Sequence, residues 1–294
     1  MKLYAIGDLH LSYEYNRKAL QELKPHPNDG LILCGDVGET EQHLELAFEA
    51  GKRNFKEVFW CPGNHELYTM GSSRPDLRGE AKYEHCVEVA RRHGVHTPED
   101  PFVRWEGEDG PALVAPIFTL YDYSFRPADV TREGALRWAE AADTVATDEF
   151  LLHPDPHPSR DAWCEALVRR FARRLETENP DSLPLVIANH WPLRQDLVFI
   201  PKVPRFSLWC GTKATEDWHT RFPTTKVVVS GHLHVPRTDW KDGVRFEEVS
   251  LGYPRQWQDV QAVGKDINDL LREILPGPPP PPGGEAEMKW RRWG

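Results

Sequence analysis

The sequence lacks several features that define whole classes of protein. Along its 294 residues no apolar run approaches the length of a membrane span, and no basic stretch followed by an apolar one opens the chain. We therefore expect neither a membrane span nor a signal peptide. The five cysteines are widely spaced and form no Cys-x-x-Cys pair, which is typical of reduced thiols in a cytoplasmic protein.

An excess of basic residues is also missing. The chain has 36 lysines and arginines against 46 aspartates and glutamates, which gives a formal net charge of -10. Because nucleic-acid backbones bind basic faces, this balance argues against broad affinity for nucleic acid and disfavours a nuclease. A small phosphorylated ligand in a locally positive site stays compatible with it.

Apolar residues are nonetheless numerous enough for a core, at 39% of the chain with 11 tryptophans. The length suits one large α/β domain. Short apolar runs predict buried strands at 2–6, 31–34, 57–61, 185–188 and 226–229. Apolar spacings of three and four predict helices at 41–55, 80–93, 132–144, 160–176 and 262–275. The aromatic-rich stretch 112–125 predicts a strand followed by a loop.

Each of the five apolar runs ends in Asp, Asn or His, usually beside a glycine. Ligand sites in α/β sheets gather outside the carboxyl ends of strands, where glycine lets the backbone turn sharply. His232 and His234 follow the fifth run two residues apart, so their side chains can reach one site. The candidate site residues are Asp8, His10, Asp36, Asn64, His65, His190, His232 and His234.

These residue types suit a pair of divalent cations. Two ions a few Å apart need several nitrogen and oxygen ligands and a bridging carboxylate, for which Asp36 is the natural candidate. Imidazole combined with carboxylate and amide oxygen favours manganese or iron, with zinc or cobalt as alternatives, and disfavours a pure calcium site.

In this order along the chain, Asp8-x-His10, Gly35-Asp36, residues 63–66, His190 and residues 231–234 resemble the metallophosphoesterase (calcineurin-like phosphoesterase) superfamily. The resemblance implies an α/β sandwich in four layers, with two mixed β-sheets flanked by helices and the active site at strand carboxyl ends. It implies that one metal binds Asp8, His10, Asp36 and His234, and the other Asp36, Asn64, His190 and His232.

The resemblance also implies a mechanism. Two metal ions bind the phosphate and lower the pKa of a bound water, so that hydroxide attacks phosphorus in line. Asp36 bridges the metals, and His65 acts as the general acid for the leaving oxygen or, alternatively, only binds phosphate. Glu66 is expected to support the site rather than to react.

A narrower resemblance concerns the substrate. Residues 120–125, 146–152, 160–164, 206–212, 214–219 and 242–254 resemble the actinobacterial phosphopantetheinyl hydrolases, which remove 4'-phosphopantetheine from holo carrier proteins. The favoured substrate is therefore holo acyl carrier protein, with small phosphate esters as further ligands. The alternatives are a broad phosphodiesterase or phosphomonoesterase, including action on cyclic nucleotides, and a scaffold that kept the fold without the chemistry.

Two groups of residues are candidates for substrate contact, in addition to Asn64 and His65. Carrier proteins are usually acidic, and a basic patch on the predicted helix 160–176 is either a docking surface or a solvated face; it comprises Arg169, Arg170, Arg173 and Arg174. Four aromatic residues either line a channel for the pantetheine arm or pack in the core; they are Tyr121, Tyr123, Phe125 and Trp209.

The chain is expected to form one catalytic domain over residues 1–275, in which residues 67–184 include an insertion that caps the site. From Pro276 a proline-rich linker leads into residues 285–294. This segment is either a flexible tail or a docking peptide anchored by Trp290 and Trp293. The sequence leaves the oligomeric state open.

Overall fold

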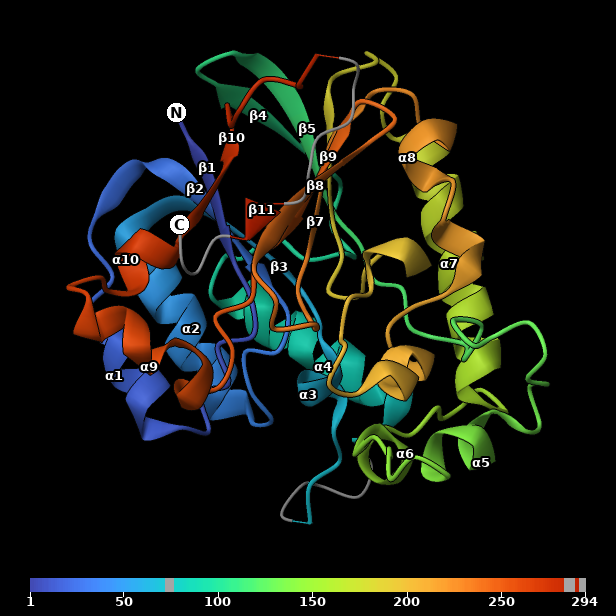
Figure 1. The fold of residues 1–294 in the computed structure, drawn as a ribbon. Coiled ribbons are helices and arrows are strands. Elements are labelled where there is room, and N and C mark those ends of the chain that lie inside the picture. The colour runs from blue at the N-terminus through green and yellow to red at the C-terminus, as the bar shows by residue number, and fades with distance from the viewer. Residues whose placement is uncertain (72–76, 283–288, 291–294) are drawn as a thin grey trace.

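The computed structural model describes residues 1–71, 77–282 and 289–290. None of the helices in these ranges is long and apolar enough to cross a membrane. The described residues form two mixed β-sheets that lie side by side (Figure 1).

The first sheet has the strand order β10-β1-β2-β3. Strands β1 (Leu3–Ile6), β2 (His26–Cys34) and β3 (Phe55–Cys61) are parallel, and β10 (Arg272–Leu275) adds to β1 in the opposite direction. Their inner faces carry apolar side chains that pack between the two sheets, among them Ala5, Ile32 and Phe59. Three of the five predicted strands are thereby confirmed.

The second sheet has the order β11-β8-β9-β7-β6-β5-β4 among the described residues. Its parallel centre consists of β5 (Gly110–Pro116), β6 (Leu185–Ala188), β7 (Thr225–Ser230) and β9 (Val244–Glu248). Antiparallel strands flank this centre: β4 (Val103–Gly107), β8 (Arg237–Lys241) and β11 (Lys289–Trp290). The other two predicted strands and the strand before the 117–125 loop are confirmed.

Helices cover the outer faces of both sheets, as Figure 1 shows. On one side lie α1 (Glu14–Gln21), α2 (Glu41–Asn54), α9 (Pro254–Ala262) and α10 (Ile267–Leu270), and on the other α7 (Arg160–Thr177) and α8 (Trp218–Arg221). Helix α4 (Gly79–Arg92) packs beside α2. Sheets enclosed by helices on both sides confirm the predicted four-layer arrangement.

Side-chain caps fix where the longer helices begin. The Thr40 hydroxyl accepts from the backbone N–H of His43 at the start of α2, and the Ser159 hydroxyl accepts from that of Ala162 at the start of α7. Shorter helical segments lie near the lower end of the sheets in Figure 1: α3 (Asn64–Leu67), α5 (Ala135–Glu140) and α6 (Asp148–Leu151). Single 3₁₀ turns occur at Gln195–Leu197, Pro204–Trp209 and Lys213–Thr215.

Two predicted helices differ from the structure. The helix predicted at 262–275 is wrong, because this segment holds the end of α9, the short α10 and then β10. Its last residues extend along the free edge of β1, where Leu275 pairs with Leu3, and this pairing overrides the helical spacing of its leucines. The helix predicted at 132–144 shrinks to α5, because turns surround residues 135–140.

The division into a domain over 1–275 and a tail over 276–294 stays a prediction. Of the described tail residues, Pro278 accepts a hydrogen bond from Arg245 through its carbonyl, and β11 pairs with β8. Trp293 lies outside the described residues. Within the insertion, β4 and β5 belong to the second sheet, and only part of residues 67–184 approaches the site.

Candidate metal centre

The candidate residues follow strands β1, β2, β3, β6 and β7 closely, in loops or, for Asn64 and His65, in the first turn of α3. Five of them have backbones in the left-handed region, with φ between 42° and 71°: Asp8, His10, Asp36, His232 and His234. Such conformations cost about 1–3 kcal/mol each and persist only where the surroundings fix them. Here they are fixed by backbone hydrogen bonds, such as Asp8 N–H to the Gly35 carbonyl at 2.8 Å and His10 N–H to the Asp36 carbonyl at 3.0 Å.

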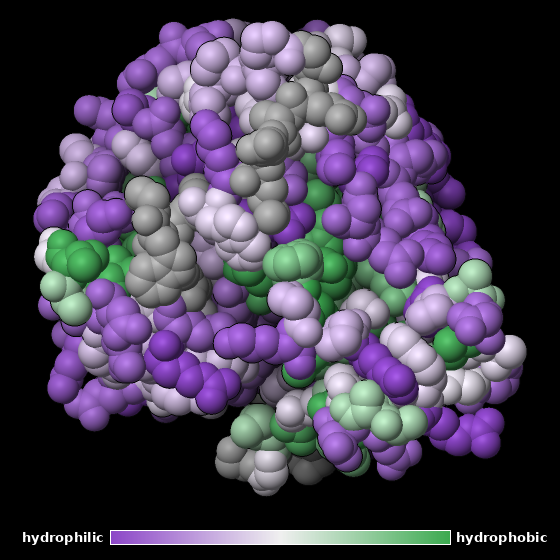
Figure 2. Space-filling view, in the orientation of Figure 1, coloured by the Kyte–Doolittle hydropathy of each residue, from purple (hydrophilic) through white to green (hydrophobic). Residues whose placement is uncertain are grey.

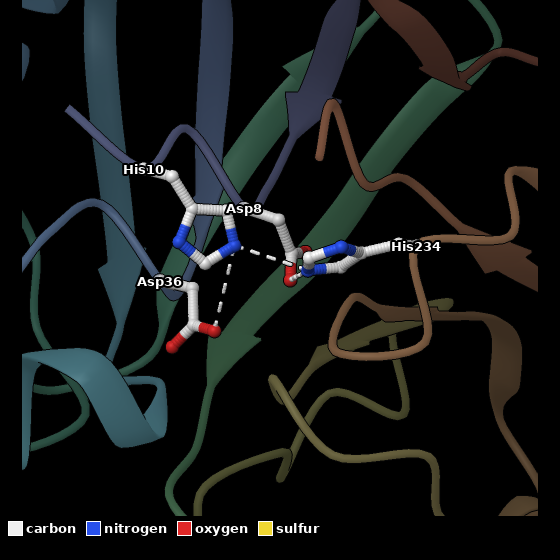
Figure 3. A group of neighbouring side chains, drawn as sticks. All are labelled: Asp8, His10, Asp36 and His234. Carbon is white, nitrogen blue, oxygen red and sulfur yellow. Dashed lines mark hydrogen bonds and ion pairs between the residues drawn. The ribbon is translucent and has the colours of Figure 1, made fainter. Parts of the chain in front are cut away.

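The first cluster combines two carboxylates and two imidazoles. Asp8, His10, Asp36 and His234 offer ligand atoms that all lie within 4.8 Å of one another. Figure 3 shows the four side chains pointing toward a common point. His234 Nε2 is 3.0 Å from Asp8 Oδ1 and 3.0 Å from His10 Nε2, while His10 Nε2 is 3.9 Å from Asp36 Oδ2.

The second cluster uses the other oxygen of Asp36. Asp36, His190 and His232 also lie within 4.8 Å of one another. His190 Nε2 is 3.5 Å from Asp36 Oδ1 and 3.2 Å from His232 Nδ1. Asp36 is thus common to both clusters, with one carboxylate oxygen facing each.

Neighbouring carbonyls fix the tautomers of two of these histidines. His190 donates from Nδ1 to the Cys34 carbonyl at 2.9 Å, and His234 donates from Nδ1 to the Gln256 side-chain oxygen at 2.8 Å. Each ring therefore directs Nε2 toward its cluster. Burial alone would lower the pKa of His190 and His234, but the carboxylates of Asp36 and Asp8 outweigh it and raise the pKa of both rings. Burial lowers the pKa of His10 and of His232 to about 3, so these two rings are neutral.

The donor set fits a pair of divalent ions. Imidazoles and carboxylates that converge in a largely buried site are the nitrogen and oxygen ligands that such cations prefer. The Asn64 amide is a second observation that indicates a cation site. Its nitrogen donates to Tyr68 and Asp148, while its buried Oδ1 has no hydrogen-bond partner and is available as a metal ligand. A Cβ at Gly63 or Gly231 would collide with the carboxylate of Asp36 or Asp8, so the backbone must approach the ligands closely there.

Glu66 organises the loops around Asp36. Its buried carboxylate accepts backbone N–H bonds from Asp36 and Val37 at 3.0 Å and from Gly63 at 2.9 Å. Burial, together with the charge of Asp36, raises the pKa of Glu66 to about 7. The contacts place Glu66 behind the site, joining the loop after β2 to the loop after β3.

His65 faces the same space from the other side of Asp36. Its Nδ1–H donates to Glu39 at 2.8 Å, and its Nε2 lies 3.8 Å from Asp36 Oδ2. Burial alone would lower the pKa of His65, but the carboxylates of Asp36 and Glu39 outweigh burial and raise it to about 9. Glu39 thus orients the ring so that Nε2 points into the site.

The site opens into a cavity of about 460 Å³. Its inner part is polar and includes Asp36, His65 and His232. Its outer part is apolar, and residues of the insertion and of the loop after β6 contribute most of it: Met70, Val145, Leu151, Ile200, Val203 and Leu233. The cavity therefore joins a metal-binding floor to an apolar wall.

The predicted substrate-contacting aromatic residues lie beneath this wall. Tyr121, Tyr123, Phe125 and Trp209 are at most 1% exposed, and none lines the cavity. Tyr123 and Trp209 both donate to Glu149, at 2.8 and 2.7 Å. These contacts make the four aromatic residues part of the packing that holds the wall.

The arginines of α7 are not brought to the site. Arg170 forms an ion pair with Glu99, Arg174 with Glu178 at 2.5 Å, and Arg169 with Glu165 one turn away. Arg170 and Arg174 line a separate pocket near Phe102, and none of Arg169, Arg170, Arg173 and Arg174 lines the site cavity. The residues that face the cavity from the insertion are instead Tyr68, Met70, residues 145–148 and Leu151.

Several further residues at the site were not among the predicted site residues, although three of them lie in stretches 146–152 and 242–254, which resemble the phosphopantetheinyl hydrolases. Ser250 donates to Asp8 Oδ2 at 2.6 Å, and Tyr253 stacks on the His10 ring with centroids 4.5 Å apart. Asp148 accepts from Asn64 and from Tyr68 at 3.0 and 2.7 Å. Only Glu39 had a local signal, since it lies three residues after Asp36 in the same loop.

Comparison with known proteins gives consistent matches. Residues 1–236 match the calcineurin-like phosphoesterase family. The [acyl-carrier-protein] phosphodiesterase PptH of Mycobacterium tuberculosis is 45% identical over 284 residues, which cover 96% of this chain and 85% of that protein. The crystal structure of the phosphopantetheinyl hydrolase PptH from the same organism superimposes with a TM-score of 0.85 at 44% identity, covering 94% of this chain and 96% of that one.

Proposed function

The chain belongs to the calcineurin-like phosphoesterase family and is a phosphoester hydrolase, and we propose that it releases 4'-phosphopantetheine from holo acyl carrier protein. The observation that carries the substrate is the likeness to PptH, which covers 96% of this chain at 45% identity. The five cysteines are free and buried, which is compatible with the proposed cytoplasmic location.

The proposed metal ligands are those of the two clusters. Asp8, His10, Asp36 and His234 hold one ion, and Asp36, His190, His232 and Asn64 hold the other, with manganese or iron favoured over zinc or cobalt. When bound, two such ions neutralise phosphate charge and lower the pKa of water at the site.

The chain's own residues then have separate roles. His65 holds a proton on Nε2 beside the shared carboxylate, where it can be donated to the serine oxygen that leaves the phosphate. Glu39 keeps this ring in place through Nδ1, and Glu66 holds the loop of Asp36. Asn64 and His65, at the polar floor of the cavity, are the proposed phosphate contacts.

The apolar wall supports an extended substrate. The pantetheine arm carries a branched aliphatic segment between its phosphate and its first amide, and the residues Leu151, Ile200 and Val203 offer it apolar surface next to the polar floor. A broad phosphodiesterase or phosphomonoesterase would use the same floor and would have no need of the wall. The two functions therefore differ in how far activity depends on the arm.

The test is the mass of the carrier. Purified protein is incubated with holo acyl carrier protein and manganese, or with iron under reducing conditions, and the carrier is weighed. We expect loss of the phosphopantetheine mass, absent with Asp36→Asn and with His65→Ala.

Parallel assays with bis-p-nitrophenyl phosphate separate the alternatives. An intact carrier together with cleavage of this small diester would replace the proposal with a broad phosphoesterase. An intact carrier and an intact diester, with metals measured in the protein, would favour a scaffold without chemistry.

A further inference from the structure

The C-terminal strand β11 lies at the same end of the second sheet as the candidate metal centre. Trp290 pairs with Arg237 across β11 and β8, and Arg237 pairs with Glu248 across β8 and β9. Two residues after Glu248, Ser250 donates to the Asp8 carboxylate. The last described residues of the chain therefore lie at the end of the second sheet that carries the candidate metal centre.

Trp290 contacts the loop that forms the apolar wall of the cavity. Its ring centroid lies 5.7 Å from that of Phe199, and the next residues of this loop, Ile200 and Val203, line the cavity. Phe199, Val203 and Trp290 remain 44%, 47% and 42% exposed. An aromatic pair that is almost half exposed therefore borders the cavity, and Figure 2 shows hydrophobic residues gathered near the centre of this face.

Lysines accompany these exposed apolar side chains. Lys202 lies between Phe199 and Val203, Lys289 precedes Trp290, and both lysines are exposed. Residues 198–206 contain two cationic residues and no carboxylate, although the whole chain has a net charge of -10. We call Phe199, Lys202, Val203, Lys289 and Trp290 the mouth face.

We propose that the mouth face is the docking surface for the acidic carrier protein, an inference that rests on the proposed function. The ester to be cleaved joins the phosphate to a serine on the carrier, so the carrier's own surface must lie against the rim of the cavity when the phosphate reaches the metal centre. Exposed aromatic side chains such as Trp290 are among the usual anchors of protein interfaces. Local positive charge also attracts an acidic partner that the chain as a whole would repel.

The experiment compares variants of the mouth face with matched controls. The test variants are Trp290→Ala, Phe199→Ala and Lys202→Glu. The controls are Leu46→Ala, at an exposed leucine on α2, and Lys56→Glu, near the start of β3 and so at the opposite end of that strand from the site. We expect kcat/KM for holo carrier protein to fall about tenfold through KM in the mouth-face variants. Turnover of bis-p-nitrophenyl phosphate should stay within about twofold, and Lys202→Glu should also weaken the salt dependence of carrier turnover.

The outcomes separate the docking surface from the function. If the wild-type protein releases the arm and the mouth-face variants keep its KM, the docking proposal is overturned while the function stands. Equal losses on both substrates would also overturn it, because the face would then only support the fold. If the wild-type protein does not release the arm, the proposed function fails. In that case, binding of carrier protein without the arm tests the docking surface separately. The docking proposal is rejected if the wild type does not bind this carrier, or if Trp290→Ala binds it equally well.

Discussion

The floor and the wall of the cavity are held in different ways. At the floor, Asp36 is 2% exposed and both of its oxygens face buried imidazoles, while Glu66 accepts three backbone N–H bonds behind it. At the wall, Val145 is 52% exposed and lines the cavity together with other apolar side chains, such as Leu151 and Val203. A buried polar group that loses its partner costs far more than an apolar contact that water can replace. We therefore expect substitutions at the floor to abolish chemistry, and substitutions at the wall to change the choice of substrate.

The largest effect is expected for Asp36→Asn, which removes the carboxylate common to both clusters. Metal content after dialysis against manganese should fall from two ions per chain to fewer than one, as measured by plasma mass spectrometry. Diester hydrolysis should fall by more than about 100-fold, because residues that merely support metal ligands already cost about 10- to 100-fold. The exposed Asp259→Asn on α9 is the control, and retention of two ions would contradict the shared-carboxylate assignment.

A smaller and more selective effect is expected for His65→Ala. Loss of a general acid costs about 10²- to 10⁴-fold when the leaving oxygen needs a proton, as serine does. The p-nitrophenolate group leaves without one, so hydrolysis of bis-p-nitrophenyl phosphate should fall much less, at unchanged metal content. Equal losses of activity on both substrates would instead indicate that His65 only binds phosphate.

Glu66→Gln tests how much Glu66 stabilises the loops of the cavity floor, rather than the reaction that takes place there. The amide can still accept hydrogen bonds, but its NH₂ group faces at least one of the backbone N–H donors of Asp36, Val37 and Gly63. An unsatisfied buried donor costs about 1–3 kcal/mol, which urea unfolding of the metal-free protein can measure. The exposed Glu84→Gln on α4 should leave the free energy of unfolding unchanged. A Glu66 variant as stable as this control would remove the contrast between floor and wall.

The smallest effect is expected at the wall, for Leu151→Ala. The loss of part of an apolar contact should reduce kcat/KM for holo carrier protein about fivefold, or about 1 kcal/mol. Hydrolysis of the small diester should not change. A parallel loss on both substrates would show that the wall contributes to the metal centre and would weaken the comparison.

Much of the floor could be predicted because its signals are local. An apolar run followed by a glycine and an Asp or His predicts a strand and the polar residue at its end, as at residues 31–36 and 226–234, and the structure places those residues together. The partners that orient them could not be found this way. Ser250 bonds to Asp8 across 242 positions, and Asp148 bonds to Asn64 across 84.

The wall and the sheet edges were decided by tertiary contacts. The arginines of α7 had the composition of a docking patch, but Arg170 pairs with Glu99 and Arg174 donates to the Asp100 carbonyl, away from the site. Residues 272–275 had the spacing of a helix, but the free edge of β1 makes them a strand. In both cases a distant partner outweighed the local pattern.

The strands, the polar residues at their ends and therefore the kind of ion that suits them could all be predicted from the order of residues along the chain. Chain order and short-range patterns are sufficient for this, because each strand and its terminal loop are read within about ten residues. Only the tertiary structure decided which imidazole nitrogen faces the site, which segments build the cavity wall and where the C-terminal strand lies. These depend on hydrogen bonds and packing between residues far apart in the chain, and such contacts exist only once the two sheets have come together.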